Sequence, residues 1–344
     1  MKVLLTGTDG YIGVMMAPYL AARGHEVRGL DTGFYRDGWL YDADVPVMTS
    51  VAKDIRNIEL DDLRGIDAVV HLAELSNDPL GQLNPTITFR INHEASTRLA
   101  RLAREAGVAR FVYTSSCSVY GIGTDEHKTE RSEPNPQTAY AECKALVERD
   151  VTALASADFT PTFLRNATAF GPSPRMRFDI VLNNLSGLAW TTGRIAMTSD
   201  GTPWRPLVHV LDICEAVACV LDAPREAVHA EIFNVGDDAA NYRVREIAQI
   251  VADTFPGCEL TLGSNAGDNR SYRVSFAKIR EHMPAFRCHH DAAAGAQQLR
   301  AVFEGAGITR ETFESRPYTR LKQLEYLIGS GQIDRDLFWV KPAS

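Results

Sequence analysis

Residues 2–13 read KVLLTGTDGYIG, and the interpretation of the chain starts from this stretch. The apolar residues 2–6 are typical of a short buried strand, and a helical pattern over residues 11–22 follows them. The turn between strand and helix contains three glycines, Gly7, Gly10 and Gly13. Glycines in such a turn permit a tight bend, a close approach of the backbone to a pyrophosphate, and close packing of helix on strand. The stretch therefore predicts a dinucleotide site with the phosphates at the start of the helix.

A second expected strand ends in Asp31, 18 residues beyond the last of these glycines. A carboxylate there accepts hydrogen bonds from both ribose hydroxyls and repels a 2′-phosphate, which favours NAD over NADP. Arg28 and Arg36 lie nearby in the sequence and leave NADP open. Asp54 and Ile55 follow another short apolar segment, where Asp54 either contacts the adenine edge or acts as a turn or cap residue.

Strands and helices alternate along the first half of the chain. Further strands are expected over residues 67–72, 110–114 and 160–165, and helices over residues 86–106 and 138–154. This alternation predicts an α/β fold with a doubly wound parallel sheet of the Rossmann type.

The alternation weakens after Gly171. We therefore expect a Rossmann domain over residues 1–166 and a smaller C-terminal α/β substrate lobe, mainly over residues 167–344. Returns to the first domain are expected near residues 205–236, at LVHV (207–210) and FNVG (233–236), and an amphipathic helix is expected over residues 318–328.

Composition excludes several classes of function. The net charge of −8 argues against nucleic acid or an anionic membrane surface as a partner. No apolar run reaches the roughly 18 residues needed to cross a bilayer, and MKVLLTG lacks the apolar segment of a signal peptide. The six cysteines show no CxxC spacing, and Cys288 beside two histidines has poor ligand geometry. We expect reduced thiols, no metal and a cytoplasmic location.

The candidate catalytic residues lie on and near the expected helix 138–154. Tyr140 and Lys144 are four residues apart, so both project from one helix face. The stretch TSSCSVYG (114–121) follows a strand at the sheet edge where doubly wound folds bind ligands. A tyrosine has an ordinary pKa of about 10, and an ammonium about 4 Å away lowers it by about three units at an effective dielectric of about 20. These residues indicate removal of a proton from an alcohol during hydride transfer.

The chain resembles the extended short-chain dehydrogenase/reductases, in the NAD-dependent nucleotide-sugar epimerase/dehydratase branch. The resemblance covers nearly all residues and rests on TGTDGYIG (6–13), Asp31, Asp54 with Ile55, HLA (71–73), Asn92, TSSCSVYG (114–121), YAECK (140–144), LRNATAFGP (164–172), RPLVHVLDI (205–213) and FNVG (233–236).

The resemblance implies a role for each matching residue. Tyr140 is the base, Lys144 its partner and a ribose ligand, and Ser116 the group that polarises the substrate oxygen. The residues that it implies to contact NAD are Tyr11, Ile12, Leu72, Ala73 and Asn92, beside the glycines, Asp31, Asp54 and Ile55. Arg205 and Arg270 hold the pyrophosphate of a nucleotide sugar, or else are surface charges. A homodimer packed through helices 86–106 and 138–154 is expected.

The residues after Ser116 bear on the reaction. In the family, 4,6-dehydratases carry an Asp-Glu pair there, whereas this chain has Cys117 and Ser118, which disfavours dehydration. Members that epimerise at C3 and C5 carry a cysteine at the position of Ser118; Cys117 is one residue away and is interpreted as a packed thiol. The simplest remaining chemistry is 4-epimerisation through a transient keto sugar.

Two departures affect the substrate pocket. Thr168 occupies the place where the family usually has asparagine, and Asn166 directly follows Arg165. Glu74 follows HLA, where the family has small residues, and is either an acid/base group in the sugar pocket or a solvated loop carboxylate. The alternatives left open are an NAD(P)H-dependent reductase of 4-keto-sugar nucleotides, a dehydratase, and a non-catalytic dinucleotide-binding regulator.

Overall fold

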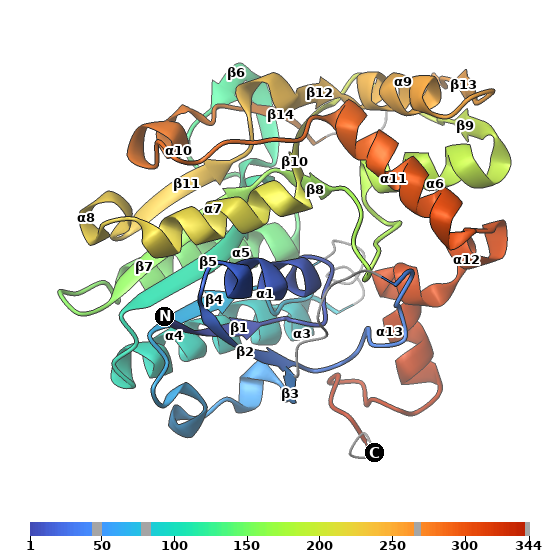
Figure 1. Ribbon diagram of the computed structural model, residues 1–344. Coiled ribbons are helices and arrows are strands. Elements are labelled where there is room, and N and C mark those ends of the chain that lie inside the picture. Colours follow the sequence, from blue (N-terminus) through green and yellow to red (C-terminus); the bar gives the residue numbers. More distant parts are fainter. Residues whose placement is uncertain (43–49, 77–83, 265–269, 341–344) are drawn as a thin grey trace.

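A seven-stranded parallel sheet forms the centre of the molecule (Figure 1). The computed structural model describes residues 1–42, 50–76, 84–264 and 270–340. In spatial order the strands are β11 (Glu231–Val235), β7 (Thr160–Asn166), β5 (Arg110–Ser116), β4 (Ala68–His71), β1 (Lys2–Thr6), β2 (Glu26–Asp31) and β3 (Ser50–Ala52). All neighbouring pairs are parallel, which confirms the predicted doubly wound α/β fold.

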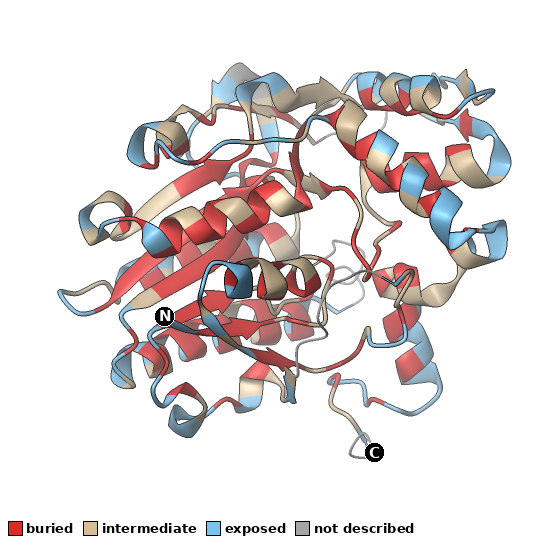
Figure 2. Ribbon diagram, viewed as in Figure 1, coloured by how far each residue is buried: buried red, intermediate tan, exposed pale blue. Residues whose placement is uncertain are grey.

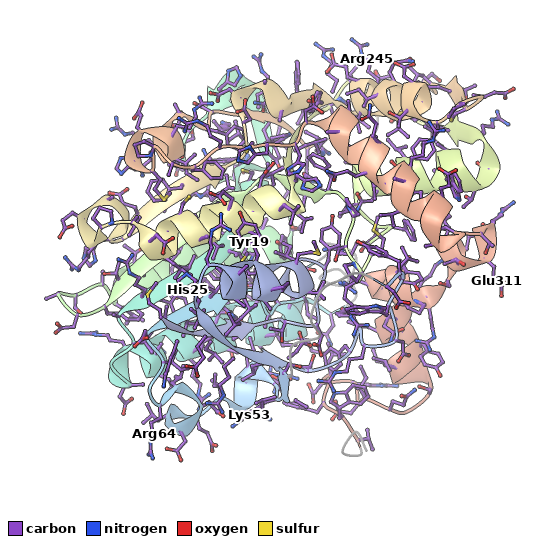
Figure 3. The ribbon with its side chains drawn as sticks, viewed as in Figure 1. Tyr19, His25, Lys53, Arg64, Arg245 and Glu311 are labelled. Carbon is purple, nitrogen blue, oxygen red and sulfur yellow. The ribbon has the colours of Figure 1, made fainter. Side chains whose placement is uncertain are left out.

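Helices cover both faces of this sheet, and the central strands are therefore buried throughout (Figure 2). One face carries α1 (Gly13–Ala22) and α7 (Val210–Asp222), which are joined by a hydrogen bond from the Tyr19 hydroxyl to Glu215 (Figure 3 labels Tyr19). The other face carries α3 (Pro85–Thr88), the π-helix η3 (Phe89–Ala95), α4 (Ser96–Glu105) and α5 (Ala139–Thr152). The single helix expected over residues 86–106 is thus interrupted by a wider π-helical turn, a feature common near functional sites.

The second lobe lies above one end of the sheet in Figure 1. Its helices α6 (Val181–Thr192), α9 (Val244–Thr254) and α11 (Ala292–Ala306) pack together around their own apolar core. Small sheets accompany them: β8 (Thr168–Phe170) with β10 (Trp204–His209) and β12 (Asn241–Arg243), β9 (Arg194–Ala196) with β13 (Glu259–Thr261), and β6 (Ile122–Lys128) with β14 (Ser271–Val274). Two short helices, α8 (Arg225–Val228) and α10 (Ala277–His282), flank β11.

The two expected returns to the first domain differ in outcome. FNVG lies in β11, at the edge of the central sheet. LVHV lies in β10 instead, outside that sheet, because its backbone pairs with β8 and β12. The chain returns with the next element, α7, whose apolar face packs on α1 and on the sheet.

The C-terminal segment, residues 316–340, packs against the loop that follows β2 (Figure 1). After α12 (Arg310–Glu314), helix α13 (Arg320–Gly329) begins two residues later than the start predicted for the helix over 318–328. Gln323 donates a hydrogen bond to the Phe34 carbonyl (2.8 Å), and the Trp339 indole donates one to the Thr32 carbonyl (2.7 Å). None of the helices in the described ranges has the length and apolar character needed to span a membrane.

Candidate active site

The glycine loop forms one wall of a cleft at the carboxyl end of the central strands. Gly7 has φ +81°, and a Cβ on it would lie 2.9 Å from the Ala73 nitrogen, so only glycine fits there. A Cβ on Gly13 would lie 2.0 Å from the Gly7 carbonyl oxygen, which shows how closely α1 approaches the loop. Tyr11 anchors the loop to the second lobe, because its hydroxyl donates to the Gly171 carbonyl (2.7 Å).

Asp31 closes the adenosine end of the cleft. It is 8% exposed, and its carboxylate accepts hydrogen bonds from the backbone N–H groups of Gly33 (2.8 Å) and Asp9 (3.0 Å). Burial raises its pKa to about 6, with the nearby Asp9 adding to the rise. The carboxylate thus fixes the glycine loop as well as facing the cleft.

Asp54 and Ile55 line the same end, as predicted from their place after a strand. Asp54 is also a cap: it accepts a hydrogen bond from the Arg56 N–H (2.8 Å) and forms an ion pair with the Arg56 guanidinium (2.7 Å). Arg36, which left NADP open, pairs with Asp9 (2.7 Å). Lys53 pairs with Asp62 (2.7 Å) at the molecular surface (Figure 3).

Ser116, Tyr140 and Lys144 line this cleft together with Leu72 and Ala73. Helix α5 begins at a capped N-terminus, where the Thr138 side chain accepts from the Ala141 N–H (3.2 Å), and the next turn carries Tyr140 and Lys144. The Lys144 ammonium is 4% exposed, donates to the Thr114 carbonyl (2.5 Å) and lies 5.5 Å from the Tyr140 ring centre.

Glu74 is buried against this lysine. One carboxylate oxygen lies 2.5 Å from the Lys144 nitrogen, and the other accepts a hydrogen bond from the Tyr113 hydroxyl (2.5 Å). Burial raises the pKa of Glu74, while Lys144 and Tyr113 oppose the rise. Burial lowers the pKa of Lys144, but Glu74 and Tyr140 outweigh it and the net shift is upward. The side chain is only 2% exposed, so Glu74 is no solvated loop carboxylate.

This geometry joins a glycine-rich phosphate loop to a Ser-Tyr-Lys group in one cleft, and residues 3–236 match the NAD dependent epimerase/dehydratase family. The chain belongs to this family. It is therefore an enzyme of that class, and NAD is its cofactor. The glycine backbone and the buried Asp31 fit NAD, since the first approaches phosphates closely and the second accepts ribose hydroxyls.

Relatives in the epimerase/dehydratase family catalyse several reactions. UDP-glucose 4-epimerase of Corynebacterium glutamicum is 27% identical over 338 residues, which cover 94% of this chain and 100% of that protein. MoeE5 in complex with UDP-glucose and NAD is 25% identical with a TM-score of 0.75, covering 90% of this chain and 100% of that one. DesIV, a dTDP-glucose 4,6-dehydratase from Streptomyces venezuelae with NAD bound, is 25% identical with a TM-score of 0.76, covering 91% and 100%.

Other predicted residues lie behind or beside the cleft of this family member. Asn92 does not line it; its amide forms two hydrogen bonds with the backbone of Leu75, a residue of the cleft wall (both 2.9 Å). Asn166 and Thr168 do line the cleft, and Ser118 donates its backbone N–H to the Ser116 hydroxyl (3.1 Å). Cys117 is turned into the core, 1% exposed, with its thiol on the Arg165 carbonyl.

Arg205 and Arg270 lie next to each other but outside the cleft lining. The Arg205 guanidinium donates to the carbonyl groups of Trp204 (2.8 Å) and Arg270. Arg205 starts from β10 and Arg270 directly precedes β14, so two segments far apart in sequence supply them.

Sequence reasoning missed two cationic residues of the cleft, Arg177 and Arg320. Arg177 lies in the irregular stretch that follows Gly171, which the alternation of strands and helices left without a place. Arg320 lies on α13, where no motif marked it.

A separate cluster contains one of the histidines beside Cys288. Ligand atoms of His209, Asp212 and His290 lie within 4.8 Å of one another. The imidazoles of His209 and His290 stack at 4.1 Å, and Asp212 accepts the backbone N–H groups of His289 and His290. Stacked rings direct their nitrogens side by side, so this arrangement fits a hydrogen-bonded cap better than a metal site.

Proposed function

We propose that this enzyme is a nucleotide-sugar 4-epimerase. The observation that carries the proposal is the chemistry around Ser116: a Tyr-Lys pair lines the same cleft, and Cys117 beside Ser116 is a buried thiol, not a carboxylate. The carboxyl groups that line the described cleft are Asp31, Asp54 and Glu74. The first two lie at the adenosine end and the third is paired with Lys144, so no carboxylate is spare for proton transfer at a second sugar carbon.

The side chains divide the work as follows. Tyr140 takes the proton of the C4 hydroxyl, and the Lys144 ammonium stabilises the tyrosinate. Ser116 donates a hydrogen bond to the oxygen that becomes a carbonyl. NAD, when bound, supplies the hydride acceptor and returns the hydride. Presentation of the opposite face of the keto sugar then inverts the centre, and Tyr140 gives its proton back.

Arg205 and Arg270 are proposed to bind the pyrophosphate of the substrate. Their proximity supports this role, because two guanidinium groups near one another bind a doubly charged group through bidentate hydrogen bonds. Replacing Arg270 with methionine is expected to raise KM roughly 10- to 100-fold with a smaller change in kcat.

A screen of UDP-, dTDP-, GDP- and CDP-sugars by NMR tests the reaction. Without added cofactor, the enzyme should convert one sugar to its C4 epimer and keep a deuterium label at C4. Tyr140→Phe should lower kcat roughly 10²- to 10⁴-fold while bound NAD stays unchanged. Turnover that needs added NADPH and stops after one reduction would instead identify a 4-keto-sugar reductase, and incorporation of solvent deuterium at C5 would identify a dehydratase.

We also propose a homodimer in the cytoplasm, with α4 and α5 at the interface. All six cysteines are free thiols, which suits a reducing compartment. The large apolar side chains that are exposed in the described residues lie elsewhere, so this interface would be polar: α4 presents Arg98, Arg101 and Arg104, and α5 presents Glu142. Light scattering at several salt concentrations tests it, because an interface of this kind weakens as salt screens the charges.

A further inference from the structure

Two buried arginines face the cofactor cleft from outside the Rossmann core, and they differ in their partners. Arg177 is fully paired: its guanidinium contacts both carboxylate oxygens of Asp179 (2.8 and 3.0 Å) and the Ser76 hydroxyl (3.2 Å). Arg320 is 3% exposed, and its guanidinium makes neither a hydrogen bond nor an ion pair with any residue that the structure describes. It lies 3.9 Å above the Tyr35 ring, which supports one face of the guanidinium.

A buried cation without an anion is costly, because the water that solvated it is lost and nothing replaces the lost hydrogen bonds. Burial lowers the pKa of Arg320 to about 10, so the group still carries its charge at neutral pH. Its position is fixed by the rest of α13, since Gln323, one turn further along, is 1% exposed and holds the Phe34 carbonyl. A fixed, charged guanidinium in a cleft is suited to an anionic ligand.

The surroundings of Arg320 identify the anion. The same cleft contains the glycine loop, with the start of α1 directed at it, and the ribose-binding Asp31. In a dinucleotide the pyrophosphate is the charged group next to that ribose. Arg205 and Arg270, the candidates for the substrate pyrophosphate, do not line this cleft.

We propose that Arg320 binds the pyrophosphate of NAD, and that the C-terminal segment 316–340 is therefore part of the cofactor site. A planar guanidinium offers two parallel N–H donors to phosphate oxygens, and the low exposure strengthens this pairing. Retention of the cofactor then depends on a helix that lies more than 280 residues beyond the glycine loop.

Binding of cofactor fragments tests this assignment without reference to turnover. Protein stripped of NAD with charcoal is titrated calorimetrically with NAD, ADP and adenosine, as wild type and as Arg320→Met. The substitution should weaken NAD and ADP roughly 10- to 100-fold and leave adenosine within about twofold, because only the first two carry the diphosphate. Arg335→Met is the matched control, since Arg335 is an exposed arginine of the same segment and its loss should change none of the three affinities.

Three further results complete the test. If Arg320→Met lowers all three affinities equally, Arg320 only supports the fold and the proposal is overturned. If it weakens UDP instead of ADP, the arginine serves the substrate and the proposal is likewise overturned. Should Arg320→Met unfold, Arg320→Gln keeps a polar side chain of similar length, and the same selective loss of ADP over adenosine is expected from it.

Discussion

Glu74 changes the electrostatics of the catalytic pair at the level of single residues. A lone ammionium beside Tyr140 would stabilise the tyrosinate strongly, whereas here a carboxylate 2.5 Å from that ammonium offsets part of its field. The proton-accepting tyrosine is therefore tuned by a residue that lies behind the lysine and does not need to touch the substrate.

Replacement of Glu74 by glutamine tests this tuning. The uncompensated Lys144 charge should favour the tyrosinate, so the acidic limb of the kcat profile should move to lower pH by about one unit. Glu74→Asp serves as the control, because it keeps the negative charge and should leave the limb near its original position. A profile that is only scaled down in height, with unchanged midpoints, would show that Glu74 acts through packing alone.

Asp31 predicts a pH dependence of cofactor binding. Its pKa of about 6 exceeds the ordinary value of 3.8, so in the NAD-free protein the ionised carboxylate costs stability that is regained as pH falls through 6. Ribose hydroxyls donate to the ionised form, and binding of NAD must therefore lower this pKa. NAD affinity should rise by up to about tenfold between pH 5 and pH 6 and level off above pH 7. Asp31→Asn should weaken binding and flatten this rise; equal slopes in both proteins would contradict the assignment.

At the scale of elements, a buried ion pair fixes α5 to the sheet. Glu148, on the same helix as Tyr140 and Lys144, contacts the Arg165 guanidinium of β7 (2.6 Å) and accepts a hydrogen bond from the Ser115 hydroxyl of β5 (2.5 Å). Both charged side chains are less than 5% exposed. The ion pair thus holds the helix that carries the base against the strand end that carries Ser116.

Glu148→Gln should therefore be costly. Loss of the carboxylate leaves the Arg165 cation buried without a counter-charge, which is expected to lower the free energy of unfolding by about 3–5 kcal/mol. Glu142→Gln, at an exposed position of the same helix, should change it by less than about 0.5 kcal/mol. Urea unfolding followed by circular dichroism measures both, and similar small losses in the two variants would show that the buried pair is dispensable.

The elements nearest the glycine loop were predictable from sequence because their signals are local. Strand β1 was predicted over its full length, and the helix with Tyr140 and Lys144 to within two residues at each end, since apolar periodicity and a Thr138 cap mark them. The π-turn at Asn92 was not predictable, because it depends on the buried amide reaching Leu75 across the fold. The pairing of LVHV with β8 likewise depends on which distant edge was free.

The cleft as a whole shows the same division between local and distant signals. Gly7, Asp31, Ser116 and Tyr140 could be placed from motifs, because each follows a strand whose end meets the cleft. The partner of Glu74 required the fold, since Lys144 lies 70 residues away. Arg320 could not be found at all, because an arginine on an amphipathic helix is an ordinary surface residue until the helix is docked.

For the whole molecule, attachment of the C-terminal segment to the cofactor cleft predicts coupling between NAD and that segment. Residues 316–340 contact the loop after β2 through Gln323 and Trp339, and NAD would fasten both sides by binding Asp31 and Arg320. A ligand at 100 times its Kd stabilises the state that binds it by about 2.7 kcal/mol. Amide hydrogen exchange in peptides from 316–340 should therefore slow by up to about 100-fold on addition of NAD, whereas peptides from α9 in the second lobe should change little. In Arg320→Met the slowing over 316–340 should shrink while that of the glycine loop remains. Equal protection of α9 and the C-terminal segment would instead mean that NAD stabilises the molecule globally, with no particular link to α13.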